Sequence, residues 1–378
     1  MKNSKVLVIG QIPPPVHGAS MMNLYLLQSL SEVGIKVDFL DKNLSKTVNQ
    51  IGKLSIAKLV RALKLVSKTA KNLIFGKSDV VILFFSASKS SLAVDFLLSK
   101  IVNFSGAKLV LYIHTIGFTE ISKNSRLNRR FIEGIFSSSV KIVTLGETMK
   151  NDLTLFNMLS KTVVIKNTSR HNFNSSLKNG LSHQKLEAPD VLFLSNLLPK
   201  KGILDFLQVA SITLKSLPDL KFSVIGSTSS PKFMSYIEEE LVRLDLVDKI
   251  KFIGEQSGDE KWHLLEEAQV LLFPSHYQEA QPLTIIEAMS VSTPTIAYDN
   301  GGIKDLVLNG INGVLVPSND VEVMSRELIE LMSDPNKLFF LSSNSRKFYE
   351  THHACLHYSN AWKSLLENLS AGPSPDTI

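Results

Sequence analysis

Short apolar runs alternate with longer, helix-like segments along the 378 residues of the chain. Each run is continuously apolar, which is typical of strands that are buried on both faces of a parallel sheet. The intervening segments are long enough to hold crossover helices. The pattern predicts strands over 5–10, 36–40, 80–85, 108–114, 141–145, 162–166, 191–195, 221–226, 250–254, 269–275, 294–298 and 313–317.

The alternation lapses over 171–190, where the sequence is polar and rich in Asn, Ser, Lys and Gly. Such a composition is typical of a linker. We therefore expect an α/β protein with two doubly wound, Rossmann-like domains that face a central cleft. The expected parts are a first domain over 1–173, a linker over 174–190, a second domain over 191–350, a C-terminal helix over 351–370 that packs back on the first domain, and a flexible tail over 371–378.

The composition, 44% hydrophobic and 20% charged, is that of a soluble globular protein. The single cysteine, Cys355, excludes a disulfide scaffold. The first residues, MKNSKVLVIG, lack the pattern of a signal peptide, and no apolar run reaches the length of a membrane span. These features predict a cytoplasmic protein.

The positive charge of the chain is concentrated in one segment. The formal net charge is +6, from 41 basic and 35 acidic residues, and residues 42–78 contain nine Lys or Arg with no Asp or Glu. The rest of the chain therefore carries 32 basic and 35 acidic residues, a net charge of −3. A general nucleic-acid binder is disfavoured by this distribution, and we expect no nucleic-acid partner.

A basic amphipathic helix is predicted inside this segment. Its cations recur every three or four residues, and an apolar row follows the nearly opposite face. The cations are Lys58, Arg61, Lys64, Lys68 and Lys71, and the apolar row is Leu59, Leu63, Val66, Ala70 and Leu73. One interpretation is a surface helix with its apolar row on the core. The other is a membrane patch, because anionic headgroups attract such cations by about 1 kcal/mol each.

Two glutamates follow the predicted strand over 269–275. Glu279 lies in the loop, and Glu287 lies in the first turn of a helix expected to open at Thr284. Ligands of doubly wound sheets bind at the carboxyl ends of strands, and helix N-termini suit phosphates. A carboxylate there can accept hydrogen bonds from sugar hydroxyls. Thr284 and Glu287 also fit a capping box, in which Glu287 would serve only its own helix.

Further polar groups follow other predicted strands. Lys201 precedes Gly202 at the start of a helix, where a cation would stabilise a diphosphate leaving group. The alternative is a solvated surface lysine. His114 ends the strand over 108–114 and is either a site residue or a satisfied structural histidine. The loop with His17, Gly18 and Ala19 is either a phosphate and acceptor loop or a turn that caps a helix.

The stretch 276–317 resembles the retaining nucleotide-sugar glycosyltransferases of family four, which have the two-domain GT-B fold. The resemblance extends over most of the chain and rests on the joint spacing of several motifs rather than on one. They are Glu279-x7-Glu287, the strand Ser292 to Ala297, Gly301-Gly302-Ile303-Lys304-Asp305 and Gly310-Ile311-Asn312-Gly313.

By this resemblance, Glu287 holds the ribose of the nucleotide and Glu279 contacts the donor sugar. Glu279, Lys201 and His114 are the expected catalytic residues. The remaining donor-binding residues are Asn196, Gln281, Pro282, Leu283, Thr284 and Gly254. Asn196 stands where the family has Arg, and Pro282 stands where the family often has Gly. Asn donates a hydrogen bond but supplies no charge.

The resemblance also implies the partners. They are a nucleoside diphosphate sugar donor, a growing saccharide acceptor on a lipid carrier, and an anionic membrane surface at the inner face of the cell membrane. Bacterial surface polysaccharide synthesis is the implied setting. The family works without a bound metal, so we expect no metal and no cofactor.

Two other classes of function compete with this interpretation. A nicotinamide-dependent dehydrogenase is suggested by the strand over 5–10 and by Asp38 in the second strand, but the first loop reads Gly-Gln-Ile-Pro-Pro-Pro and lacks the glycine pattern of a dinucleotide site. A non-catalytic saccharide- or lipid-binding protein of the same fold is suggested by the departures at Asn196 and Pro282.

Overall fold

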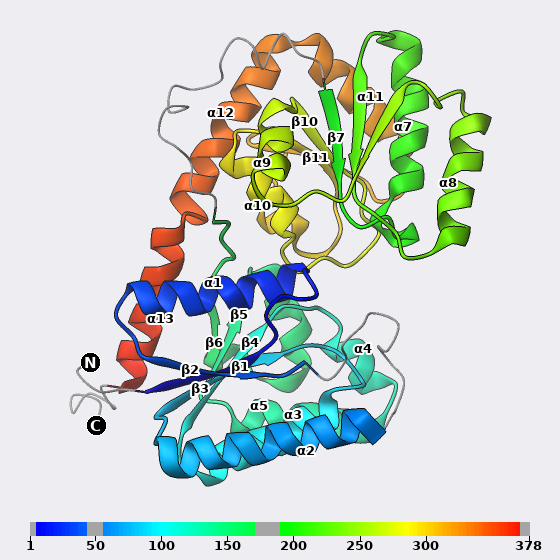
Figure 1. The fold of residues 1–378 in the computed structure, drawn as a ribbon. Helices are drawn as coiled ribbons and strands as arrows, with labels where there is room; N and C mark the ends of the chain where they lie inside the picture. Colours follow the sequence, from blue (N-terminus) through cyan, green and yellow to red (C-terminus); the bar gives the residue numbers. More distant parts are fainter. Residues whose placement is uncertain (1–4, 44–55, 171–189, 371–378) are drawn as a thin grey trace. The chain divides into compact units, whose positions relative to one another are not determined.

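The computed structural model describes residues 5–43, 56–170 and 190–370, which form two compact units (Figure 1). Unit 1 comprises the described residues of Met1–Thr168 and Cys355–Ile378, and unit 2 comprises those of Ser169–Ala354. The predicted linker over 174–190, apart from residue 190, and the predicted tail over 371–378 lie outside the described residues.

Unit 1 is built on a parallel six-stranded sheet of order β2-β1-β3-β4-β5-β6. The strands confirm the sequence prediction to within two residues at each end. They are β1 (Val6–Gly10), β2 (Val37–Asp41), β3 (Val80–Phe85), β4 (Lys108–Ile113), β5 (Lys141–Thr144) and β6 (Thr162–Val164). β1, β3 and β4 are wholly or almost wholly buried, which explains their continuous apolar sequence.

Helices cover both faces of this sheet. In Figure 1, α2, α3 and α5 lie on one face, and α1 and α13 lie on the other. The helices are α1 (Gly18–Glu32), α2 (Ile56–Lys71) continued by the π-helix η2 (Asn72–Gly76), α3 (Leu92–Phe104), α4 (Phe118–Lys123), α5 (Arg126–Ser138), the 3-10 helices η3 (Thr148–Phe156) and η4 (Leu159–Lys161), and α13 (Cys355–Ser370).

The last helix, α13, belongs to unit 1 although it follows unit 2 in sequence. Its Trp362 is fully buried, with its ring 4.9 Å from the ring of Tyr112 on β4. The hydroxyl groups of Tyr358 and Tyr112 lie 3.1 Å apart. Buried aromatic side chains of this size contribute strongly to packing, so these contacts fix α13 on unit 1.

Unit 2 repeats the plan with a parallel sheet of order β12-β11-β10-β7-β8-β9. Its strands also confirm the prediction: β7 (Asp190–Leu194), β8 (Lys221–Ile225), β9 (Ile250–Gly254), β10 (Val270–Phe273), β11 (Thr295–Tyr298) and β12 (Gly313–Val316). The strand order reverses at β7, which pairs with β8 on one side and β10 on the other. The carboxyl ends of β7 and β10 are therefore the topological switch point, where doubly wound sheets bind ligands.

The unit 2 helices enclose two hydrophobic cores, one on each face of the sheet. Val191 and Phe193 enter one core, and Leu192 and Leu194 enter the other, because successive side chains of a strand point to opposite faces. The helices are η6 (Pro199–Lys201), α7 (Ile203–Ser216), α8 (Pro231–Arg243), α9 (Gly258–Glu267), α10 (Leu283–Ser290), η7 (Gly301–Asp305), α11 (Val321–Ser333) and α12 (Pro335–His352).

The predicted basic helix forms as α2, but only the second half of its predicted apolar row lies towards the core: Leu73 is buried, and Val66 and Ala70 are partly buried. Leu59 and Leu63 are 62% and 57% exposed. The buried positions are Ala62, Leu65, Thr69 and Leu73. The buried Thr69 is tolerated because its hydroxyl donates to the Leu65 carbonyl at 2.9 Å, so no polar group is left unsatisfied. The expectation that Leu59 and Leu63 pack on the core is therefore wrong.

Candidate functional site

The loops that follow β7 and β10 are fastened to each other at the switch point. The His276 N–H donates to the Lys200 carbonyl at 2.9 Å. Gly202 has φ +83°, and a Cβ atom there would lie 1.8 Å from the Pro274 carbonyl oxygen. Only glycine accommodates both the backbone angle and this close approach. The Lys201-Gly202 pair of the sequence thus brings Lys201 against the loop after β10.

Lys201 and Glu279 form an ion pair in this position. Lys201 Nζ lies 2.6 Å from Glu279 Oε1, and the Ser275 hydroxyl donates to the same oxygen at 2.7 Å. Lys201 Nζ also lies 5.1 Å from the ring centre of Tyr277, within the range of a cation–π contact. The side chains of Lys201 and Glu279 are 23% and 13% exposed, so both charges are largely withdrawn from water while still reaching the surface.

Two glycines hold the backbone at Glu279. The Gly302 N–H donates to the Glu279 carbonyl at 2.6 Å. A Cβ atom at Gly301 would lie 2.4 Å from the Glu279 carbonyl oxygen, and one at Gly302 would lie 1.9 Å from that of Ala280. The Gly-Gly motif therefore has a steric cause, because it lets the loop after β10 lie directly on η7.

A polar network fixes the base of the same loop. Both ring nitrogens of His276 face oxygen atoms: Nε2 lies 3.3 Å from Asp205 Oδ2, and Nδ1 lies 2.6 Å from Asn319 Oδ1. The Tyr298 hydroxyl donates to Asp205 Oδ2 at 2.6 Å. Burial, and then the contact with Asp205, raise the pKa of Tyr298 above its ordinary value, so this hydroxyl remains a donor.

Glu287 forms a second ion pair, with Lys261 on α9. Lys261 Nζ lies 2.6 Å from Glu287 Oε1, and the side chains are 21% and 9% exposed. The alternative of a capping box is wrong. The helix α10 begins at Leu283, so Thr284 lies inside it, and the N-cap residue Pro282 makes no side-chain cap hydrogen bond. The Glu287 carboxylate is therefore paired with Lys261 rather than committed to the N-terminus of its own helix.

The other predicted donor-binding residues line the same edge of unit 2. Asn196 is exposed in the loop after β7, Gln281 and Pro282 are buried, and Leu283 and Thr284 are half-buried at the start of α10. Gly254 ends β9 with φ +85° and accepts a hydrogen bond from the Gly226 N–H at 2.9 Å. Because Pro282 precedes α10, the N–H groups at the start of that helix remain intact.

The predicted phosphate loop belongs to unit 1, whereas the residues described above belong to unit 2. His17 is the N-cap residue of α1, and Gly18 and Ala19 open the helix. His17 Nδ1 accepts from the Ser20 N–H at 3.2 Å, and Ser20 Oγ accepts from the His17 N–H at 3.0 Å. Burial lowers the pKa of His17, which favours the neutral ring that this capping contact needs. This loop does cap a helix, as the alternative interpretation proposed.

His114 lies at the carboxyl end of β4, also in unit 1. Its ring stacks on Phe84 at a centroid distance of 4.8 Å and meets Tyr112 edge-on at 4.1 Å. Burial, with a smaller contribution from His17, lowers the pKa of His114 to about 3. Among the described residues its buried Nε2 atom has no hydrogen-bond partner. His114 is therefore a neutral group with one nitrogen left over for a hydrogen bond.

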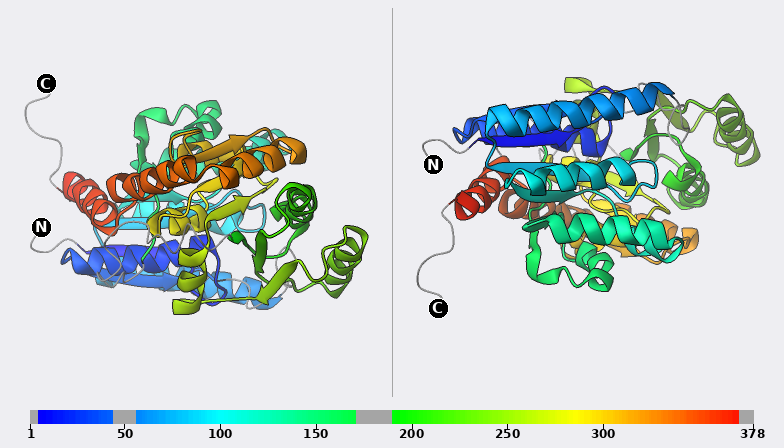
Figure 2. Two further views of the ribbon diagram at one scale, coloured as in Figure 1. Left: turned by 90° about the horizontal axis from the view of Figure 1, so that it is seen from above. Right: turned by 90° about the horizontal axis from the view of Figure 1, so that it is seen from below.

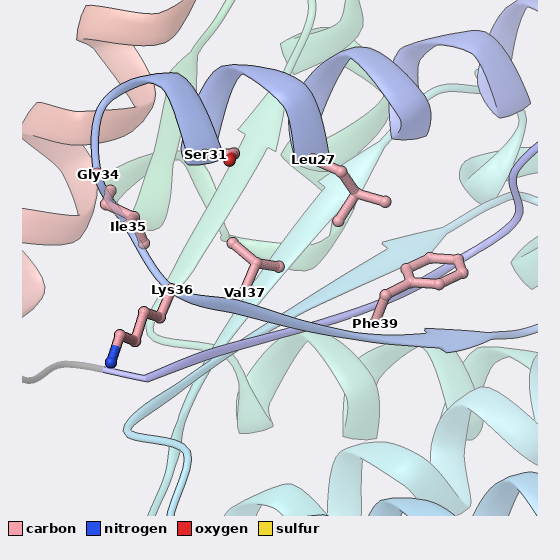
Figure 3. Close-up of a pocket in the computed structure, with 7 residues that line it drawn as sticks. All are labelled: Leu27, Ser31, Gly34, Ile35, Lys36, Val37 and Phe39. Atoms are coloured by element: carbon pink, nitrogen blue, oxygen red, sulfur yellow. The ribbon is translucent and has the colours of Figure 1, made fainter.

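A hollow in unit 1 is shown in Figure 3, and none of the predicted site residues lines it. It is lined by the end of α1 and the start of β2, including Leu27, Ile35, Val37 and Phe39.

In the described parts of the chain, no three His, Cys, Asp or Glu side chains gather as a metal site, and the expectation of a metal-free protein stays a prediction. Within residues 5–43, 56–170 and 190–370, no helix has the length and apolar content that crossing a bilayer requires.

Two residues of the candidate site, Ser275 and Lys261, were not predicted from the sequence. Ser275 follows β10 directly, so inspection of strand ends could have found it. Lys261 gave no such signal, because its partner Glu287 lies 26 positions away and no motif surrounds it.

Comparison with known proteins finds a family model that matches less than half of the chain. Residues 181–348 match the model of the family described as glycosyl transferases group 1. An uncharacterized glycosyltransferase of Haemophilus influenzae is 31% identical over 228 residues, which cover 60% of this chain and 61% of that protein. AmsK of Erwinia amylovora, an amylovoran biosynthesis glycosyltransferase, is 26% identical over 42% of this chain and 39% of its own. The match thus spans about three fifths, or less, of these relatives.

Solved structures match nearly the whole chain. Anabaena HepE, in complex with UDP and glucose, has a TM-score of 0.72 at 17% identity and covers 97% of this chain and 100% of its own. Sucrose-phosphate synthase from Thermosynechococcus elongatus has a TM-score of 0.75 at 16% identity and covers 98% and 100%. At such identities these likenesses establish the fold alone, which is the GT-B fold of glycosyltransferases.

Proposed function

We propose that the protein is a retaining glycosyltransferase that moves a sugar from a nucleoside diphosphate sugar to a saccharide acceptor. One observation carries the proposal: the ion pairs Lys201–Glu279 and Lys261–Glu287 lie in the segment that matches glycosyl transferases group 1, and the first of them sits at the switch point of the sheet. The first pair keeps a carboxylate for hydroxyl groups beside a cation for phosphate oxygens, and the second keeps a carboxylate for hydroxyl groups.

Lys201 is proposed as the cation for the leaving diphosphate. As the bond between the anomeric carbon and the phosphate oxygen breaks, negative charge grows on that oxygen, and a fixed cation lowers the barrier. The free N–H groups at the start of α10 add partial positive charge in the same unit. When the diphosphate takes over Lys201, Glu279 is released to accept hydrogen bonds from the hydroxyls of the donor sugar.

Glu287 is proposed to hold the ribose hydroxyls, and Lys261 to position it. A partly buried carboxylate accepts two hydroxyl groups without losing its charge. Lys261 orients that carboxylate through the 2.6 Å contact before the nucleotide binds.

The proposed reaction balances without a protein base. The acceptor hydroxyl forms the new bond to the anomeric carbon on the face that the phosphate leaves, and its proton passes to the departing phosphate oxygen. The pKa of about 3 for His114 supports a role in hydrogen bonding to a sugar rather than in proton transfer at neutral pH.

The proposed donor is a UDP or GDP sugar, and the proposed acceptor is a growing saccharide on a lipid carrier in bacterial surface polysaccharide synthesis. HepE in complex with UDP and glucose supports the donor class, and the name of AmsK supports the setting. The protein would then work in the cytoplasm, peripherally at the inner face of the cell membrane.

Release of nucleoside diphosphate tests the proposal. The full chain is incubated with a panel of UDP and GDP sugars and with extracted lipid-linked saccharides, and the product is analysed by NMR. The proposal predicts turnover of one donor with the anomeric configuration retained. Glu279→Gln should lose turnover and keep nucleotide binding. An inverted product would contradict the retaining mechanism, and binding without turnover on any acceptor would favour the non-catalytic alternative.

A further inference from the structure

We propose that the outer surface of helix α2 docks on an anionic lipid bilayer. This α2 surface is defined by Leu59, Val60, Leu63, Lys64, Lys68 and Lys71. It lies in unit 1 and shares no residue with the ion pairs of unit 2. The docking does not depend on the sugar transfer proposed above.

The apolar part of this surface is exposed rather than packed. Leu59, Val60 and Leu63 are 62%, 44% and 57% exposed, and the π-helix that continues α2 exposes Ile74 at 65% and Phe75 at 81%. Single exposed apolar residues are ordinary, but a group of five on one helical segment is the mark of an interaction surface.

The lysines border this apolar group on the same half of the helix. At about 100° per residue, Leu59, Leu63 and Val60 span roughly 100° of the helix circumference, and the lysines occupy the next roughly 80°. The buried residues Ala62, Leu65 and Thr69 lie on the remaining half. An apolar strip beside a strip of lysines is the arrangement of helices that lie in the headgroup region of a bilayer.

The whole helix layer around α2 is basic. The view from below in Figure 2 shows α2, α3 and α5 side by side. These helices contain nine Lys or Arg (five on α2, one on α3, three on α5) and two acids, Asp95 and Glu133. Asp95 is buried and paired with Lys42, and Glu133 is paired with Arg129. The layer therefore presents a net positive face.

The combination of leucines and lysines selects a bilayer over a nucleic acid. The phosphates of a nucleic acid attract only the cations, so contact with a nucleic acid would not stabilise the exposed Leu59, Leu63 and Phe75 side chains. An anionic bilayer stabilises both kinds of side chain: its headgroups attract the lysines, and its acyl boundary buries the apolar side chains.

Co-sedimentation with vesicles tests the charge and the apolar parts separately. The full chain is mixed with phosphatidylcholine vesicles with or without about a third phosphatidylglycerol. We expect binding to the anionic vesicles, weakened roughly fivefold for each lysine removed in Lys64→Ser, Lys68→Ser and Lys71→Ser. Leu59→Ser with Leu63→Ser should weaken it by at least about a hundredfold. The matched control removes the exposed unit 2 lysines in Lys215→Ser, Lys221→Ser and Lys232→Ser and should leave binding unchanged.

Tryptophan fluorescence tests the orientation. The two native tryptophans, Trp262 and Trp362, are buried. Phe75→Trp should therefore show a blue-shifted emission when anionic vesicles are added. Phe340→Trp, on exposed α12 of unit 2, is the matched control and should show no shift.

Equal loss of binding in the α2 and control lysine variants would overturn the proposal, because binding would then depend only on the net charge of the protein and not on the α2 surface. Absence of binding to anionic vesicles at physiological salt would overturn it as well, as would tighter binding to a mixed RNA than to vesicles. Folding of each variant is checked by its thermal unfolding. Vesicle binding is measured without a nucleotide sugar, so failure of the proposed sugar transfer would leave this result intact.

Discussion

Lys201 Nζ and Glu279 Oε1 lie 2.6 Å apart although their residues are 78 positions apart in the sequence. The pair exists because the loops after β7 and β10 are joined by the contact of His276 with Lys200 and by the close approach at Gly202. Each charge satisfies the other before a ligand arrives. We propose that a diphosphate that binds Lys201 displaces Glu279, which would couple phosphate binding to the release of a carboxylate.

Removal of the Lys201 charge should slow sugar transfer much more than it weakens donor binding. For Lys201→Met we expect kcat to fall by about 10²–10³, the usual cost of losing a group that stabilises charge in the transition state. Lys200→Met is the matched control, because Lys200 is adjacent and lies 5.9 Å from the Tyr277 ring centre. Steady-state kinetics should show a loss below about tenfold for this control. Equal losses in the two variants would contradict a specific role for Lys201.

Lys261 and Glu287 should act as one unit in nucleotide binding. Calorimetry of UDP and GDP binding to Lys261→Met, Glu287→Gln and the double variant measures their coupling. We expect the double variant to bind no worse than Glu287→Gln, with a coupling free energy of about 1–3 kcal/mol. Lys249→Met breaks an exposed pair with Asp245 in the same unit and should change nothing. Additive losses would show that Lys261 acts independently of Glu287.

Gly202 should be required for the folding of unit 2 for two reasons: its backbone angle and the lack of space for a Cβ atom. Gly202 and Gly310 have φ +83° and +72°, but a Cβ atom meets the Pro274 oxygen only at Gly202, with nothing within 4 Å at Gly310. Gly310→Ala should cost about 1–2 kcal/mol of unfolding free energy from backbone strain. Gly202→Ala should cost at least about 2 kcal/mol more, because the two loops must separate. Denaturant unfolding that gave equal costs would contradict the steric account.

The buried His114 should make the protein less stable in acid. Its pKa is about 3 in the folded chain and 6.5 in the reference state, so the unfolded chain binds the proton first as the pH falls. The free energy of unfolding should decrease below pH 6.5, by about 2 kcal/mol at pH 5. In His114→Gln the loss between pH 7.5 and pH 5 should be smaller by that amount. The exposed His263→Gln is the control and should follow the unchanged protein.

The sequence predicted the strands well because buried parallel strands carry a local signal. Val191 to Leu194 read as one apolar run, since alternate residues enter cores on opposite faces of the sheet. The positions of Glu279 and Lys201 followed from the same logic, because both lie in the segments that follow strands that the pattern identified. The Gly301-Gly302 motif was read as part of a resemblance, and the structure supplies its steric reason.

Three features could not be read from local patterns. The buried face of α2 depends on which neighbours the helix packs against. The sequence pattern therefore predicted that Leu59 and Leu63 face the core, whereas the structure buries Thr69 and exposes both leucines. The start of α10 at Leu283 removed the capping box that the spacing of Thr284 and Glu287 suggested. Lys261 entered the site only through tertiary contact with Glu287. The first and the third depend on contacts between elements distant in sequence.

A thermal-shift panel of UDP, GDP, ADP, CMP and NAD, repeated on Glu287→Ala, tests the central claim most directly. Ligand at about a hundred times its dissociation constant should add about 2.7 kcal/mol of apparent stability. The account predicts stabilisation by UDP or GDP, lost in Glu287→Ala and retained in the exposed control Glu267→Ala. Stabilisation by NAD alone, or by a nucleoside diphosphate equally in Glu287→Ala, would contradict the assignment of the nucleotide-sugar site.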